Sequence, residues 1–215
     1  MPFTLYSTDY LDIDDSTVVS IPEAVYTEML DLHDTSRLFA RIYFSTGPSR
    51  YAAVQPCANG EENPIYVPLW MIPDGEPMGQ AVEVIFRGTD AFPQATAVSL
   101  KPTDSAFYST DIKETLTQQL TRLGILRVGD MIQLRLEEMG GYPMAFYVSK
   151  CEPTDVVLLD GEEIVVDYEE ASDVWDGRRP DTPIPPKPEE PIGNLLGGGP
   201  VRRMADGRAW NPYRA

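Results

Sequence analysis

Residues 92–108, FPQATAVSLKPTDSAFY, mark the point at which the sequence changes character. The run from Ala97 to Leu100 is typical of a strand, and Pro102 with the acidic turn at Asp104 stops it before helical periodicity begins. Strand-like segments dominate the chain before this junction, whereas a helix and further strands follow it. The junction therefore predicts two structural parts that meet near residues 105–106.

Upstream of the junction, short apolar runs alternate with turn residues between Val18 and Val84. This pattern predicts many short strands rather than a few long elements. The runs are VVSIP, RLFARIYF, YAAVQP, IYVPLWMI and QAVEVIF.

One helix is predicted among these strands, in the segment PEAVYTEMLDL. Pro22 suits the first helical position, and Glu23 favours the positive end of the helix dipole. Val25, Met29 and Leu32 recur on one face, which we expect to pack on the sheet. Within the upstream part we also expect Trp70 to be mostly buried, because its neighbours in sequence are apolar.

Downstream of the junction, residues 109–130 predict the clearest helix of the chain. Ser109 or Thr110 can cap it, and Gly124 supplies a left-handed end. Its apolar residues repeat at helical spacing at Ile112, Leu116, Leu120 and Leu123. Four strand-like runs follow, MIQLRL, MAFYVSKCE, VVLLD and EEIVVDY, so a helix and a small sheet should form the second part.

The composition limits the classes of function. The chain has 215 residues, 42% of them hydrophobic, a formal charge of −17 and a pI near 4.3. A surface for duplex nucleic acid needs clustered Lys and Arg, which this body lacks. No apolar run approaches the roughly 18 residues that span a bilayer, so we expect no membrane partner. We expect a soluble protein of the cytoplasm or nucleus, with Cys57 and Cys151 as free thiols.

The sequence contains few of the residue types that act in catalysis or bind metals. His33 is the only histidine, which leaves no hydrolytic triad and no Cys–His pair, and we expect it to cap the first helix or to lie exposed. No closely spaced cysteine pair offers a zinc site. We therefore predict a binding protein with no catalytic residues, no cofactor and no metal.

From about Ala171 the chain is dense in Pro and Gly and poor in periodic apolar residues. Such a composition predicts an extended or disordered tail over residues 172–215, with a polyproline-like spacer from Pro183 to Pro191. The last fifteen residues hold four arginines and one aspartate, a net charge of +3, together with Trp210 and Tyr213. They are interpreted as a tether that docks on a negative surface. A solvated tail without a role is the alternative.

Four blocks of the sequence occur in the order and at the spacing of one known family. They are YVPLWMI, GQAVEVIFRGTDAFPQATAVSLKPTDSAFY, IKETLTQQLTRLGILRVGDMIQL and EEIVVDYEEA. Between Ser16 and Ala171 the chain resembles the N-terminal region of the ubiquitin-fusion-degradation protein. The resemblance implies an α+β, β-rich fold: an N-terminal arm (1–15), a double-psi β-barrel (16–105) and a small α/β roll (106–171). Pro102 would then end the last barrel strand.

The resemblance also implies partners. Family members are adaptors that bind ubiquitin or polyubiquitin on the barrel and reach the AAA+ segregase valosin-containing protein through a C-terminal motif, Phe-x-Gly-x-Gly-x-x-Leu. Its counterpart here is Leu195, Gly197 and Gly199, with Arg202 at the position of the final leucine. We therefore expect a non-catalytic adaptor.

A second hypothesis stays open, because the tail ends in arginines and aromatics. The chain would be a structural or cementing subunit of a large assembly, such as a minor capsid protein of a large DNA virus. Its tail would thread between neighbouring coat or scaffold proteins in the virion. The tail residues expected to contact a partner in the two hypotheses are Leu195, Gly197, Gly199, Arg202, Arg203, Trp210 and Tyr213.

Overall fold

The structure is a computed structural model, and it describes residues 2–11, 17–58, 63–109, 113–136, 140–160 and 163–173. Residues 1–174 form one compact unit. The described part of this unit is rich in strands and contains two α-helices. Neither helix is long and apolar enough to cross a bilayer.

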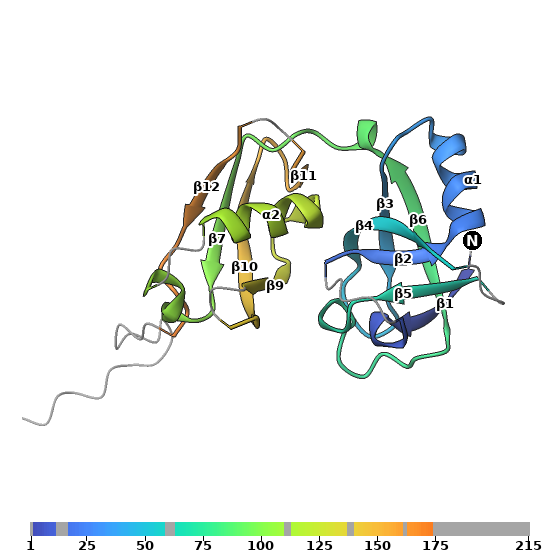
Figure 1. The fold of residues 1–215 in the computed structure, drawn as a ribbon, viewed down its shortest axis with the longest axis horizontal. Helices are drawn as coiled ribbons and strands as arrows, with labels where there is room; N and C mark the ends of the chain where they lie inside the picture. Colours follow the sequence, from blue (N-terminus) through green and yellow to red (C-terminus); the bar gives the residue numbers. More distant parts are fainter. Residues whose placement is uncertain are drawn as a thin grey trace, which may run out of the picture. The chain divides into compact units, whose positions relative to one another are not determined.

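Six strands close into a barrel in the order β1-β5-β2-β4-β3-β6 (Figure 1). Parallel pairs join β1 to β5 and β2 to β4, and an antiparallel pair of β1 with β6 closes the ring. A closed ring leaves no free strand edge in this part of the molecule. The strands are β1 (Pro2–Ser7), β2 (Val19–Pro22), β3 (Leu38–Tyr43), β4 (Arg50–Cys57), β5 (Pro64–Val67) and β6 (Ala81–Gly88).

Every second side chain of the barrel strands points inward and fills the barrel. In β6, Val82, Val84 and Phe86 are buried while the residues between them are more accessible, as a two-residue period requires. Phe86 meets Phe3 of β1 edge to face, with ring centroids 5.6 Å apart. The prediction of a strand-rich first part is confirmed, and its strands form a closed barrel. The predicted N-terminal arm (1–15), separate from the barrel, is wrong, because β1 supplies one of the six barrel strands.

Helix α1 (Glu23–His33) begins directly after Pro22 and ends at Asp34, whose φ of 45° is left-handed. Four of its side chains, Val25, Tyr26, Met29 and Leu30, pack partly buried against the core. The helix is confirmed, but the expected apolar face is wrong at its end: Leu32 is 70% exposed. The contacting face continues through Leu30 instead.

A buried carboxylate fixes a loop on the barrel. Glu76 is 9% exposed and accepts hydrogen bonds from the backbone N–H groups of Ser45 and Thr46 at 3.0 and 2.8 Å. The hydroxyls of the same two residues also donate to it, at 3.0 and 2.7 Å. Burial raises the pKa of Glu76, but these hydrogen bonds outweigh burial and hold its pKa below the ordinary value.

Strand β7 (Ala97–Pro102) does not belong to the barrel. It pairs antiparallel with β10 and parallel with β12, so the prediction that Pro102 ends the last barrel strand is wrong. The chain leaves the barrel earlier, through a short 3-10 helix at Thr89–Ala91. Local periodicity marks 97–100 correctly as a strand, but it cannot say which sheet the strand joins.

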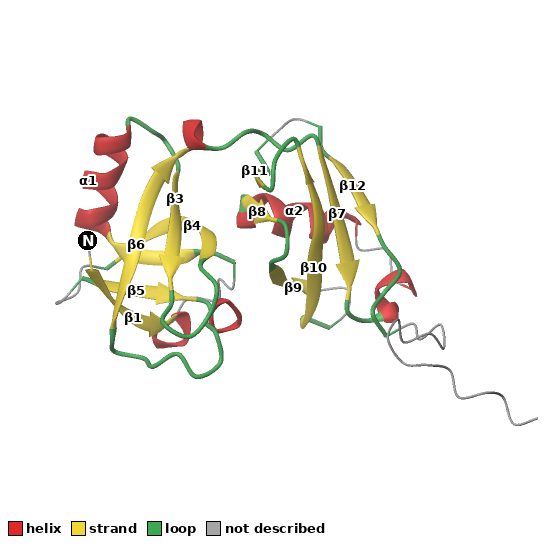
Figure 2. Cartoon of the chain, turned by 180° about the vertical axis from the view of Figure 1, so that it is seen from behind, coloured by secondary structure: helices red, strands yellow, loops and turns green. Residues whose placement is uncertain are grey.

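The second part is a four-stranded sheet in the order β12-β7-β10-β9, which we call the C-terminal sheet. Its further strands are β9 (Met131–Leu136), β10 (Tyr142–Glu152) and β12 (Val165–Tyr168), and a separate pair joins β8 (Ile125–Arg127) to β11 (Val156–Leu158). Helix α2 (Lys113–Leu123) packs on one face of the sheet through Leu116, Leu120 and Leu123, all buried. In Figure 2 the strands lie in front of α2, which covers the opposite face.

The predicted second helix and its glycine end are confirmed. The N–H of Gly124 donates to the Leu120 carbonyl at 3.0 Å, and Gly124 has a φ of +71°. Residues 110–112, which include Thr110 and Ile112, lie outside the described residues. The barrel and the C-terminal sheet contribute to one continuous cluster of buried apolar side chains, which runs from Leu5 and Val84 to Leu120 and Phe146.

Candidate protein-binding surface

Three neighbouring tyrosines of the barrel, together with a leucine of the turn after β5, are called the tyrosine surface: Tyr6, Tyr10, Tyr66 and Leu69. Tyr6 and Tyr66 are half-buried. Tyr10 is 72% exposed and Leu69 is 58% exposed. The ring of Tyr6 lies 6.1 Å from that of Tyr10 and 5.8 Å from that of Tyr66, measured between centroids. Large exposed aromatics beside an apolar side chain are typical of protein-binding sites.

Strand register and two short turns build this surface. The parallel pairing of β1 with β5 sets Tyr6 beside Tyr66. Ser7 then caps a 3-10 helix, since its hydroxyl accepts from the Asp9 N–H at 3.2 Å, and this turn returns Tyr10 to Tyr6. A second 3-10 helix, Leu69–Met71, starts after Pro68 and exposes Leu69 while Met71 is buried.

A depression of about 210 Å³ adjoins the tyrosine surface. The barrel lines it with Thr8, Asp9, Pro68, Leu69 and Trp70, and the C-terminal sheet lines it with Gln133, Arg135 and Pro143. It thus offers one carboxylate and one guanidinium at the rim of an apolar area. Trp70 is half-buried and packs against the main core, which places it beside the barrel as expected, with part of its surface still accessible.

The environment of the tyrosine surface does not favour ionisation. Burial raises the pKa of Tyr66, and the nearby Cys57 and Tyr6 raise it further. Burial likewise raises the pKa of the Cys57 thiol. The Tyr66 hydroxyl therefore stays protonated at neutral pH, and the ring offers apolar contact with a hydroxyl that can form hydrogen bonds.

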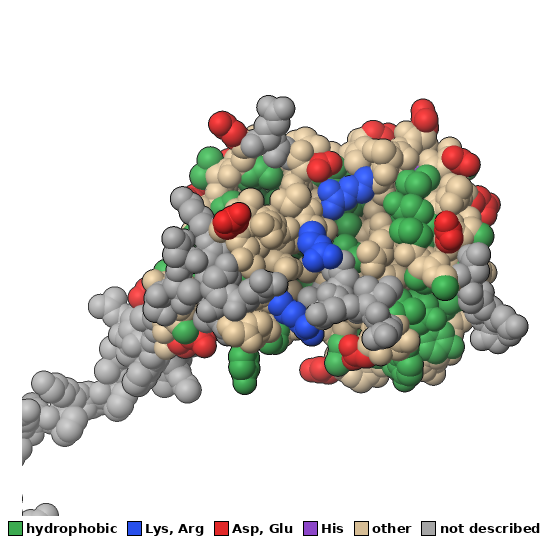
Figure 3. Space-filling model, in the orientation of Figure 1, with side chains coloured by type: hydrophobic (Ala, Val, Ile, Leu, Met, Phe, Trp, Pro, Cys, Tyr) green, Lys and Arg blue, Asp and Glu red, His purple; other side chains and the backbone are tan. Residues whose placement is uncertain are grey.

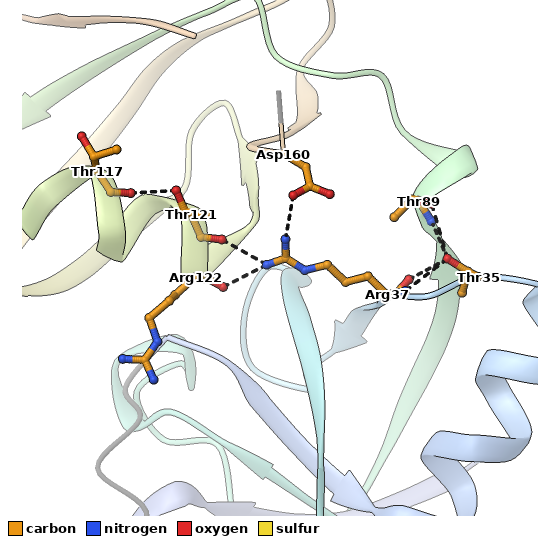
Figure 4. Close-up of polar contacts among 7 residues, drawn as sticks. All are labelled: Thr35, Arg37, Thr89, Thr117, Thr121, Arg122 and Asp160. Carbon is orange, nitrogen blue, oxygen red and sulfur yellow. Dashed lines mark hydrogen bonds and ion pairs between the residues drawn. The ribbon is translucent and has the colours of Figure 1, made fainter. Parts of the chain in front are cut away.

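Arg37 joins the barrel to the C-terminal end of α2 (Figure 4). Its Nη2 donates to the carbonyls of Thr121 and Arg122 at 3.1 and 3.2 Å, and its Nη1 lies 3.3 Å from Asp160 Oδ1. Those carbonyls have no partner within the helix and carry its negative partial charge, which a guanidinium stabilises. A Cβ on Gly124 would lie 2.3 Å from Nη2, so a larger residue here would displace the Arg37 guanidinium, in addition to the strain of its φ of +71°.

A second ion pair joins the same two parts. Asp130 is buried and accepts from Arg50 of the barrel at 2.8 Å and from Arg127 at 2.6 Å. Arg127 also lies over the ring of Tyr51, 5.7 Å from its centroid. On the face shown in Figure 3, Lys and Arg side chains form a row along the middle, and Asp and Glu side chains are scattered over the rest of the face. The arginines at the junction therefore fix the two parts against each other.

The residues considered for catalysis do not meet. Among the described residues, no group of carboxylates, thiols and imidazole could hold a metal ion. Both cysteines are free thiols. Cys151 is buried, and its burial, followed by Asp155 and Asp130, raises its pKa to about 11. A thiol with such a pKa is a poor nucleophile at neutral pH.

The tail residues singled out in the sequence lie outside the described residues: Leu195, Gly197, Gly199, Arg202, Arg203, Trp210 and Tyr213. Their expected role in partner binding stays a prediction. The tyrosine surface, in contrast, was missed by sequence reasoning. The alternation of Leu5 and Ser7, both buried, with Tyr6 was a signal for it.

Comparison with models of known protein families finds no match to the chain. Comparison with curated protein sequences finds no match either.

Proposed function

We propose that the chain is a non-catalytic adaptor that binds ubiquitin through the tyrosine surface. The observation that carries the proposal is the ring cluster of Tyr6, Tyr10 and Tyr66 on a closed barrel, with Tyr10 and the nearby Leu69 exposed. Tyrosine supplies a large contact area at a small cost in side-chain entropy and is enriched among the residues that dominate binding energy. The family resemblance supports ubiquitin as the partner.

The proposed fold is a double-psi β-barrel followed by an α/β roll. Two parallel pairs between strands distant in sequence, β1 with β5 and β2 with β4, support the barrel type. A helix packed on one face of a four-stranded sheet supports the roll.

Binding through this surface should be weak. Four partly exposed side chains and a small depression form a site well below the area of a standard interface. We expect a dissociation constant between about 10 μM and 1 mM. Weak single contacts suit an adaptor, because polyubiquitin can raise the apparent affinity through several linked contacts.

The test is a titration of isotope-labelled ubiquitin with the full chain, followed by amide chemical shifts. Replacing both Tyr10→Ala and Leu69→Ala should weaken binding at least about tenfold, because each side chain is an exposed anchor. Tyr142→Ala is the matched control, since Tyr142 is 76% exposed but belongs to the C-terminal sheet. Unchanged ubiquitin spectra at the highest soluble concentration would remove this proposal.

We further propose that the tail recruits the AAA+ segregase through Leu195, Gly197 and Gly199. Deleting residues 194–215 should then abolish capture by the segregase and leave ubiquitin binding intact. The structural-subunit alternative is favoured by one observation, the net charge of +3 and the two aromatics in the last fifteen residues of an acidic chain. In that case the same deletion should abolish incorporation into the assembly, with Trp210 and Tyr213 as its anchors.

A further inference from the structure

Strand β12 is an outermost strand of the C-terminal sheet (Figure 1). It pairs with β7 on one side, and none of the described strands pairs with its other side. The opposite outer strand, β9, likewise pairs along its full length with its one neighbour, β10. β12 is short and is followed by a run of carboxylates, so its edge is the one to consider for binding.

The hydrogen bonds to β7 show which backbone groups of β12 point outward. The N–H of Val165 donates to the Thr96 carbonyl at 3.1 Å, and the N–H of Glu169 donates to the Leu100 carbonyl at 3.0 Å. In a parallel ladder, alternate residues direct both backbone groups toward the same neighbour. The N–H and C=O of Val166 therefore point away from β7, toward the free edge.

An apolar groove runs beside this edge. Its volume is about 500 Å³, within the range of sites that enclose a ligand side chain. Ile164 and Val166 pack against the main core from this side, and Val165 is 60% exposed. The groove is lined by Thr117, Leu120 and Thr121 of α2 and by Leu159, Glu163, Ile164, Val165 and Val166.

The chemistry of the groove wall is apolar despite its threonines. The Thr121 hydroxyl donates to the Thr117 carbonyl at 2.9 Å within α2 (Figure 4). This bond satisfies the hydroxyl inside the helix and leaves the methyl group for contact. An incoming side chain would therefore meet the Thr121 methyl group and the apolar side chains of the groove, together with the Glu163 carboxylate.

Carboxylates flank the edge on both sides. Glu163 precedes β12, Asp167 lies within it, and Glu169 and Glu170 follow it, all of them exposed. If two copies of β12 paired antiparallel about Val166, Glu163 of each copy would face Glu169 of the other. Like charges opposite each other destabilise a strand pair, so this edge disfavours a second copy and favours a basic strand.

We propose that the β12 edge and its groove bind an extended segment of a partner protein, added to the sheet as a further strand. The segment carries a large apolar side chain that enters the groove beside Val166. Its neighbours in sequence are Lys or Arg, because alternate side chains of a strand face opposite sides and would lie near Asp167. Main-chain hydrogen bonds to Val166 fix its register.

This inference goes beyond the proposed ubiquitin binding, since it concerns a different surface and a linear partner. The two proposals fail separately. Tyr10→Ala with Leu69→Ala should leave binding at the β12 edge unchanged, and variants of the edge should leave ubiquitin binding unchanged.

The test uses the full isotope-labelled chain and the synthetic peptide Ser-Lys-Leu-Arg-Val-Lys-Ser, with the glutamate version Ser-Glu-Leu-Glu-Val-Glu-Ser as control. Amide shifts should concentrate at residues 163–168 and on α2 around Thr117 and Thr121. Val166→Pro removes the outward N–H without removing a bond to β7, and should weaken binding about tenfold. Asp167→Lys, an exposed substitution, should weaken it about threefold.

Three outcomes would overturn the proposal. The basic peptide could fail to bind at about 1 mM, it could bind both variants as well as the original chain, or the glutamate peptide could bind equally well. A chain that self-associates in sedimentation experiments, and stops doing so after Val166→Pro, would show that a second copy occupies the edge. Because Asp167→Lys leaves the backbone pairing of β12 with β7 in place, it tests the proposal even if the proline variant fails to fold.

Discussion

Gly124 and Arg37 should be energetically coupled, because one needs the space that the other occupies. The substitution Gly124→Ala places a methyl group where Nη2 of Arg37 lies, at 2.3 Å, in a residue whose φ is +71°. The left-handed conformation costs an alanine about 1–2 kcal/mol. Displacing Arg37 from the carbonyls of Thr121 and Arg122 costs about 1–2 kcal/mol more. The total loss in the free energy of unfolding should be about 2–4 kcal/mol.

A double-mutant cycle separates the two costs. In the background Arg37→Met the guanidinium is gone, so Gly124→Ala should cost only the conformational part, about 1–2 kcal/mol. The free energy of unfolding is measured by urea denaturation at pH 7 for the four proteins of the cycle. Arg87→Met serves as a control, because Arg87 is exposed and its guanidinium bonds the neighbouring Phe86 carbonyl.

The expected coupling energy is about 1–2 kcal/mol, the share of the loss that requires Arg37. A coupling below about 0.5 kcal/mol would refute the reasoning, since additive costs are the norm for residues that do not interact. The same measurements test the continuous core. All four proteins should unfold in one transition, because the barrel and the C-terminal sheet share one cluster of buried side chains.

Further predictions concern the buried carboxylates and the thiols. The pKa of Glu76 is lower in the folded protein than in the unfolded chain. The ionised carboxylate therefore stabilises the fold above the unfolded pKa of about 4.3, and this stabilisation is lost as pH falls through the folded pKa. Glu76→Gln should lower the free energy of unfolding by about 2 kcal/mol at pH 7 and should make it depend less on pH in acid, as measured by denaturation curves. Asp130→Ala removes the shared partner of two arginines and should cost about 3 kcal/mol. Glu152→Ala removes the exposed ion pair between Glu152 and Lys150 and should cost under about 1 kcal/mol in the same assay. With a pKa raised to about 11, Cys151 should react with a thiol reagent at pH 8 only on unfolding, and the half-exposed Cys57 should react first; equal rates in the native protein would contradict this.

Elements encoded by local pattern could be predicted from the sequence. The periodic leucines of α2 and the glycine that ends it specify a helix without help from distant residues. Strands β9, β10 and β12 likewise follow from alternation and β-branched composition. In each case the information lies within the element itself.

Pairing between distant strands could not be predicted in the same way. β1 belongs to the barrel because it pairs with β5 on one side and with β6 on the other. The sequence of residues 2–7 alone does not indicate either pairing. β7 joins β10 and β12, which follow it by more than forty residues. Alternation says that a segment is a strand, but hydrogen-bonding partners decide its sheet.

The candidate site was hidden for the same reason. Tyr6 and Tyr66 are sixty residues apart, and only the register of β1 against β5 brings their rings together. Tyr10 joins them through a turn capped by Ser7. A local signal existed in the alternation around Tyr6, yet it could mark only an exposed face and not the cluster that forms there.

Binding at the tyrosine surface should depend on the junction as well as on the tyrosines. The depression beside this surface takes Leu69 and Trp70 from the barrel but Gln133 and Arg135 from the C-terminal sheet. Arg50 and Asp130 hold these two parts together at 2.8 Å. Because the junction is rigid, both walls of the depression are already in place before a partner binds. Ordering them on binding therefore costs little free energy. A partner that contacts both walls would therefore bind more tightly because the two parts are already fixed in place.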